Sequence, residues 1–87
     1  MEFKIYNGNV FEFECESTKC YGILVDYKST NEKILDTVIV DVITNFQETL
    51  EEKDYIKERK AFSRPFPDGV KGIVDVSRNL EKKPGLI

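Results

Sequence analysis

Strict alternation of polar and apolar residues in the first half of the chain constrains its fold more than any other feature. The segment from Val10 to Glu16 alternates without interruption. Its apolar set is Phe11, Phe13 and Cys15, and its acidic set is Glu12, Glu14 and Glu16. Successive side chains of a β-strand point to opposite faces, so this pattern predicts a strand with one dry and one acidic face. Residues 2–6 also alternate, and the Asn-Gly-Asn stretch at 7–9 is typical of a tight turn between two strands.

Two further strands are predicted after this hairpin. Residues 21–27 place Tyr21, Ile23, Val25 and Tyr27 on one face, and Gly22 opposite them indicates a bulge or a close backbone approach. The segment from Ile34 to Ile43 carries branched apolar residues on both faces, which favours a central position in the sheet. The connections at 17–19 and 28–33 are short and polar, so the strands should form an antiparallel meander.

In the second half of the chain the strand-like alternation stops, and the sequence predicts a helix instead. Residues 44 to about 58 contain strong helix formers without Gly or Pro, and Thr44 and Gln47 fit a capping box, so we expect a helix there. Its apolar stripe is poor, however, and residues 55–62 could instead be extended. Pro and Gly at 63–69 end any helix. Residues 70–76 then predict a strand, residues 77–80 a single helical turn, and residues 81–87 a loose tail.

These elements together predict a mainly β, α+β domain spanning residues 1–87. Its architecture would be a small curved antiparallel sheet or open barrel with one packed helix. So few strands leave no room for a large cavity. The residues expected to be buried are Phe11, Phe13, Ile23, Val25, Val38 and Val40.

Composition excludes several classes of function. The 87 residues contain no His, which removes the usual general base and a common metal ligand. The net charge is −3, which disfavours binding to nucleic acid. No apolar run is long enough to span a membrane, and no leader sequence is evident, so we expect a cytoplasmic protein. Gly69 and Gly72 do not form a phosphate loop. We therefore expect a protein that is not an enzyme and has no cofactor.

Cys15 and Cys20 are separated by four residues, and no second pair or His completes a zinc site. A disulfide across the hairpin is geometrically possible. In a cytoplasmic protein, reduced and partly buried thiols without a metal are expected.

The acidic row Glu12, Glu14 and Glu16, joined by Asp26, is the candidate partner-binding site. It would meet a basic surface of a protein partner, whereas the alternative is a solvated strand face that guards an edge against aggregation. Two other groups are interpreted structurally. The aromatic residues Phe3, Tyr6, Phe11, Phe13, Tyr21 and Tyr27 are expected to pack in the core, and the basic stretch at 57–60 to end the helix.

Three short segments stand out for their order along the chain: Gly8-Asn9-Val10-Phe11-Glu12-Phe13, Tyr21-Gly22-Ile23-Leu24-Val25 and Val38-Ile39-Val40-Asp41-Val42. Together they resemble the immunity protein 26 family. The chain departs from the family at Asn9, where Asp is usual, and lacks its Trp-containing closing strand. The resemblance implies a non-enzymatic protein that neutralises a toxin by surface contact. The alternative function is a structural or assembly subunit, such as a small homo-oligomeric barrel encoded by a phage or mobile element.

Overall fold

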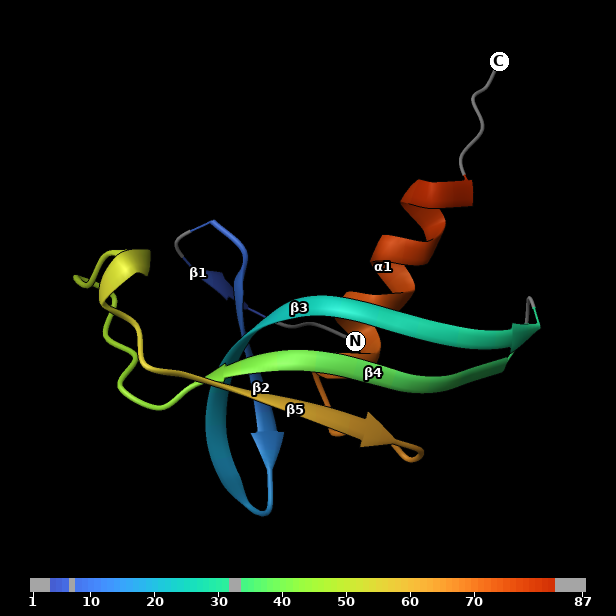
Figure 1. Cartoon of the computed structure of the whole chain (residues 1–87), viewed down its shortest axis with the longest axis horizontal. Helices are drawn as coiled ribbons and strands as arrows, with labels where there is room; N and C mark the ends of the chain where they lie inside the picture. The colour runs from blue at the N-terminus through green and yellow to red at the C-terminus, as the bar shows by residue number, and fades with distance from the viewer. Residues whose placement is uncertain (1–3, 7, 32–33, 83–87) are drawn as a thin grey trace.

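The computed structural model describes residues 4–6, 8–31 and 34–82. Within them an open antiparallel sheet has the order β1-β2-β3-β4-β5, and one α-helix packs on it (Figure 1). The elements are β1 (Ile5–Tyr6), β2 (Val10–Cys15), β3 (Thr18–Asn31), β4 (Ile34–Ile43), a 3-10 turn η1 (Glu52–Asp54), β5 (Lys57–Ser63) and α1 (Val70–Lys82). The predicted fold class, a mainly β domain with a curved antiparallel sheet and one helix, is confirmed.

The hairpin of β2 and β3 is closed by a two-residue turn at Glu16 and Ser17. Both residues have positive φ, 54° and 65°, and the flanking residues Cys15 and Thr18 face each other across the pair. This is the backbone of a mirror-image turn, which matches the right-handed twist of the strands it joins. β3 is longer than the predicted strand at both ends, because residues 18–20 pair with β2 and residues 28–31 continue its pairing with β4.

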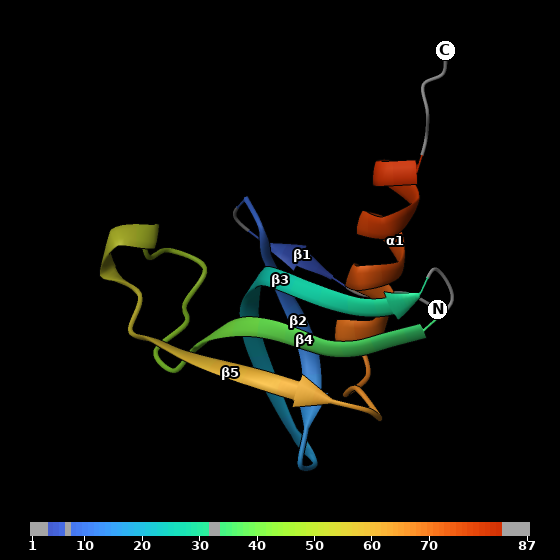
Figure 2. The ribbon, with the colours of Figure 1, turned by 45° about the vertical axis from the view of Figure 1, so that its right-hand side comes forward.

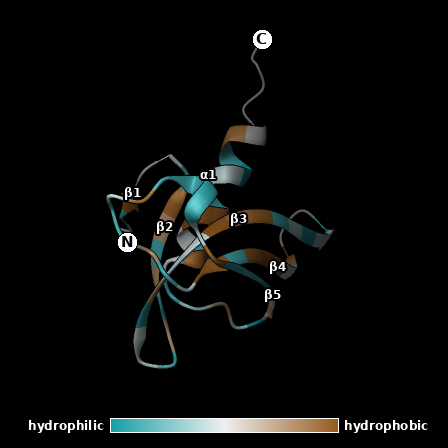
Figure 3. Cartoon of the chain, turned by 60° about the vertical axis from the view of Figure 1, so that its left-hand side comes forward, coloured by the Kyte–Doolittle hydropathy of each residue, from teal (hydrophilic) through white to brown (hydrophobic). Residues whose placement is uncertain are grey.

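The sheet has an apolar cluster on each face. Phe11, Phe13, Val38 and Val40 are buried beneath α1 on one face. In Figure 3 the stretches of β2, β3 and β4 nearest α1 are coloured hydrophobic, whereas much of the α1 ribbon is coloured hydrophilic. The other face is covered by the connection between β4 and β5, which lies away from α1 at the opposite end of the sheet (Figure 2).

The predicted helix over residues 44–58 is wrong. These residues form an irregular connection with η1, followed by the start of β5, and the extended alternative is confirmed for residues 57–62. The physical reason is the poor apolar stripe. From the irregular connection, Phe46 stacks on Tyr21 with ring centroids 4.6 Å apart, and it also contacts Tyr6 and Tyr55.

The predicted strand over residues 70–76 is also wrong, because this segment is the first part of α1. Val70, Ile73 and Val74 are buried against the sheet, and their i, i+3, i+4 spacing forms one face of a helix. Val76, which a strand would have buried, is 47% exposed. The helix continues through Lys82, so the predicted tail does not begin at residue 81, and residues 83–87 lie outside the described part of the chain.

Burial is confirmed for four of the six expected core residues, namely Phe11, Phe13, Val38 and Val40. Ile23 is half-buried in the second cluster. Val25 is 41% exposed, and its predicted burial is wrong. The register between β3 and β4 shifts between Leu24 and Asp26, so Val25 is the extra residue of a bulge and leaves the alternation of its strand.

Candidate functional site

Glu12 lies at the centre of a polar network on β2. The hydroxyl of Tyr6 donates a hydrogen bond to its Oε1 at 2.8 Å, and Lys19 Nζ lies 3.1 Å from its Oε2. Its side chain is only 22% exposed. The strands bring these three groups together, because β1 and β3 flank β2 on either side. Both carboxylate oxygens are thus engaged within the chain.

The network shifts the pKa of each member in the direction its contacts dictate. The hydrogen bond from Tyr6 lowers the pKa of Glu12, and the hydrogen-bonded Lys19 ammonium lowers it further. The same hydrogen bond raises the pKa of Tyr6 to about 12, because losing the phenol proton would put two negative charges side by side. Glu12 also raises the pKa of Lys19. The network is therefore a salt bridge with a phenol donor, stable over the neutral pH range.

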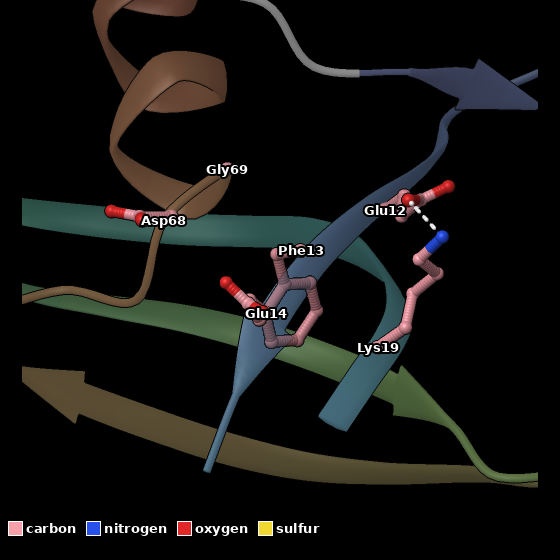
Figure 4. Close-up of a pocket in the computed structure, with 6 residues that line it drawn as sticks. All are labelled: Glu12, Phe13, Glu14, Lys19, Asp68 and Gly69. Atoms are coloured by element: carbon pink, nitrogen blue, oxygen red, sulfur yellow. Dashed lines mark ion pairs between the residues drawn. The ribbon is translucent and has the colours of Figure 1, made fainter. Parts of the chain in front are cut away.

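A pocket of about 290 Å³ lies beside this network. Its lining residues are Glu12, Phe13, Glu14, Lys19, Asp68 and Gly69 (Figure 4). In Figure 4 the carboxylates of Glu14 and Asp68 lie on the other side of Phe13 from the Glu12–Lys19 ion pair. In the described part of the chain, no ion pair neutralises Glu14 or Asp68. The pocket thus holds three carboxylates and one ammonium.

The segment before α1 forms one wall of the pocket, and Gly69 fixes its position. The amide of Glu14 donates to the carbonyl of Asp68 at 3.2 Å. Gly69 has φ of +94°, and a Cβ on it would lie 2.7 Å from the Glu12 carbonyl oxygen and 2.7 Å from Phe13 Cβ. Only glycine meets both the left-handed backbone and the close approach. The approach of α1 to β2 therefore depends on Gly69.

Of the other predicted site residues, Glu14 lines the same pocket as Glu12, whereas Glu16 and Asp26 are separated from it. Glu16 lies in the hairpin turn and is exposed. Asp26 shares the face of Glu12 because of the bulge at Val25, but it lies five residues beyond Tyr21, the cross-strand partner of Glu12. At about 3.3 Å per residue, five residues of extended strand span roughly 16 Å. Asp68 joins Glu14 instead, although in the sequence it indicated only a turn before a strand.

Cys15 and Cys20 are free thiols on the α1 side of the hairpin, both half-buried against the first cluster. Burial raises the pKa of the Cys20 thiol, and the neighbouring Cys15 raises it further. Cys20 is therefore less readily ionised than an ordinary cysteine. The described residues contain no group of three or more side chains that could hold a metal ion. Within the same residues, no helix has both the length and the apolar character needed to cross a membrane.

The basic stretch at 57–60 lies on β5 and does not end a helix as predicted. Arg59 makes a two-pronged contact with Asp41 of β4, with Nε 2.8 Å from Oδ1 and Nη2 3.1 Å from Oδ2. This contact lowers the pKa of Asp41 and raises that of Arg59. Lys57 and Lys60 flank it and are exposed.

Comparison of the chain with family models, curated proteins and solved structures finds no match. The resemblance to the immunity protein 26 family therefore stays a prediction.

Proposed function

We propose that this chain is a non-enzymatic binding domain that recognises a basic segment of a partner protein through the pocket along β2. The observation that carries the proposal is the charge of the pocket lining. Glu12 is already engaged by Lys19 and Tyr6, whereas Glu14 and Asp68 add negative charge that no ion pair among the described residues neutralises. Inhibition of a toxin by surface contact, as the family resemblance implies, is one function such a domain would serve.

A lysine or arginine side chain suits this pocket because of the charge of its lining. The carboxylates of Glu14 and Asp68 would receive the cationic head. Exposed ion pairs contribute little to affinity and more to the rate and selectivity of association. The pocket would therefore select a basic partner, and the rest of the interface would supply affinity.

The test is a titration of the ¹⁵N-labelled protein with an acetylated and amidated Gly-Lys-Arg-Lys-Gly peptide, followed by NMR. We expect shifts concentrated at the amides of Glu14, Asp68 and Gly69, which fade as salt is added. The uncharged Gly-Gln-Gln-Gln-Gly peptide should cause none. The double variant Glu14→Gln/Asp68→Asn should bind about fivefold more weakly, the effect of two exposed ion pairs.

The matched control is Glu52→Gln/Asp54→Asn, which removes one Glu and one Asp charge from η1 and leaves the pocket intact. It should bind the basic peptide almost as the parent does. Equal weakening of both variants would mean that only net charge matters, and the pocket would then have no role.

The alternative function, a self-assembling subunit, is favoured by a different observation. A groove of about 390 Å³ lies between α1, β3 and the β1 region, lined mainly by apolar residues. Ile5, Val76 and Leu80 in its lining are 50%, 47% and 69% exposed. The protruding Leu80 and the hollow beside it lie on one surface, as a two-fold contact between copies requires.

Light scattering after size exclusion separates the two functions. The binding domain should remain a monomer across concentrations. An assembly subunit would give a dimer or larger species that Leu80→Lys dissociates.

A further inference from the structure

The outer edge of β5 is long, regular and uncovered by the described residues. β5 pairs with β4 through seven residue pairs, from Thr37 with Ser63 to Ile43 with Lys57, without a register shift. It is the last strand in the sheet order, and its free side faces outward in both Figure 1 and Figure 2. An edge of this kind can pair with another extended chain, and many proteins block it with bulges or a covering loop.

The direction of the backbone groups follows from one hydrogen bond at the start of β5. The amide of Thr44 donates to the carbonyl of Ile56 at 2.9 Å, so Ile56 directs its carbonyl toward the β4 side. In an antiparallel pair this direction alternates along the strand. Residues 58, 60 and 62 therefore bond to β4, whereas residues 57, 59, 61 and 63 present their backbone groups to the open edge. No backbone hydrogen bond between described residues reaches the outward groups of Arg59 and Ala61.

The charge of the edge indicates what would pair with it. β5 contains Lys57, Arg59 and Lys60 against Glu58. Because Arg59 is paired with Asp41 of β4, two positive charges and one negative remain on the strand, or +1, in a chain with a net charge of −3. β5 leads directly into a pocket of about 440 Å³ lined by Arg64, Pro65, Phe66 and Lys71, which adds two cationic side chains. A second copy of β5 would bring the same net positive charge to the edge, whereas an acidic segment would bring the opposite charge and pair favourably with it.

We propose that β5 binds an extended acidic segment of a partner protein, which adds to the sheet as a further strand. Backbone hydrogen bonds to residues 59 and 61 would hold the segment, and Lys57 and Lys60 would select its acidic side chains. This site is separate from the β2 pocket and carries the opposite charge preference. The two sites can therefore be tested independently.

The test uses an acetylated and amidated Thr-Val-Glu-Val-Asp-Val-Glu-Thr peptide with the full chain. We expect binding that slows hydrogen exchange of the Arg59 and Ala61 amides and leaves the already bonded amides of Lys60 and Phe62 little changed. The same peptide with Lys in place of every acidic residue should not bind. Lys57→Gln/Lys60→Gln should bind the acidic peptide about fivefold more weakly at low salt.

A backbone variant tests the edge itself. Ala61→Pro removes an outward N–H and leaves the pairing with β4, because proline is tolerated at a strand edge whose N–H faces solvent. It should fold and no longer bind the acidic peptide. The double lysine variant keeps the proposal testable if the proline variant does not fold.

The remaining outcomes overturn the proposal. Equal binding of the acidic and lysine peptides would refute the charge argument. Protection of residues 59 and 61 without peptide, rising with protein concentration, would make a second copy the occupant. If hydrogen exchange of the Arg59 and Ala61 amides is not slowed at any peptide concentration, the edge binds no acidic strand. Its charges would then serve only to prevent aggregation. Glu14→Gln/Asp68→Asn should bind the acidic peptide like the parent, so failure of the β2 pocket would not affect this result.

Discussion

At the scale of single residues, Glu12 links the stability of the domain to pH. Its pKa in the folded chain is below 4.5, the ordinary value of a glutamate. Ionised Glu12 therefore contributes its full stabilisation of the folded state above pH 4.5. This contribution is lost as the pH falls through the lower pKa that Glu12 has in the folded chain. We expect the free energy of unfolding, measured in urea, to be lower at pH 3 than at pH 6. The decrease should be smaller for the Glu12→Gln variant than for the parent. Glu52→Gln on η1 should follow the parent, and identical slopes for Glu12→Gln and the parent would contradict this prediction.

Single residues also show what the sequence could and could not reveal. Of the two expectations at Gly22, a bulge or a close backbone approach, the close approach is confirmed, because a Cβ there would lie 3.0 Å from the Asp41 carbonyl oxygen and 2.6 Å from Val40 Cγ1. The exposure of Val25 could not be foreseen, since a bulge depends on how β3 and β4 align and not on residue type. Asp68 was missed for a similar reason. Its place beside Glu14 arises from a contact between segments more than fifty residues apart.

At the scale of elements, the residues in the turn between β2 and β3 are not those that its backbone conformation favours most. Glu16 and Ser17 hold left-handed conformations that most side chains adopt only at a cost. Glu16→Asn/Ser17→Gly supplies the residues that this turn prefers, and should stabilise the domain by about 1 kcal/mol. Chemical denaturation measures the change. The control variant Lys28→Asn/Ser29→Gly places the same two residues inside β3 and should destabilise the domain. A loss of stability from Glu16→Asn/Ser17→Gly would show that the turn is not strained.

The strands of the first half were predictable and the elements of the second half were not, for a physical reason. β2 and β4 combine alternation with residues that favour strands, so local preference and packing agree. Residues 44–58 individually favour a helix, but a helix over them would have no continuous apolar face to pack against the sheet. In α1, β-branched residues at 70, 73 and 74 favour a strand locally, but docking their common face on the sheet outweighs that preference.

At the scale of the whole molecule, Phe13 connects the sheet to its helix. It is buried, its ring lies 5.3 Å from Phe11 and 6.0 Å from Phe62, and its backbone touches Gly69. Phe13→Ala should lower the unfolding free energy by about 3–5 kcal/mol, measured in urea. Phe13→Leu is the milder variant if the alanine form is unfolded. Val25→Ala, at an exposed position, should cost far less, and a Phe13→Ala loss below about 1 kcal/mol would exclude Phe13 from the core.

The position of α1 in the chain has a consequence for synthesis on the ribosome. The apolar sheet face that α1 covers is built from β2, β3 and β4, which leave the ribosome before it. From Ile43 to Lys82 the ribosome must add 39 residues, which takes roughly 2 to 8 s at typical translation rates. During that interval Phe11, Phe13, Val38 and Val40 have no cover from their own chain. Until the helix arrives, the nascent sheet therefore exposes an apolar face, the kind of surface that makes folding intermediates prone to aggregation.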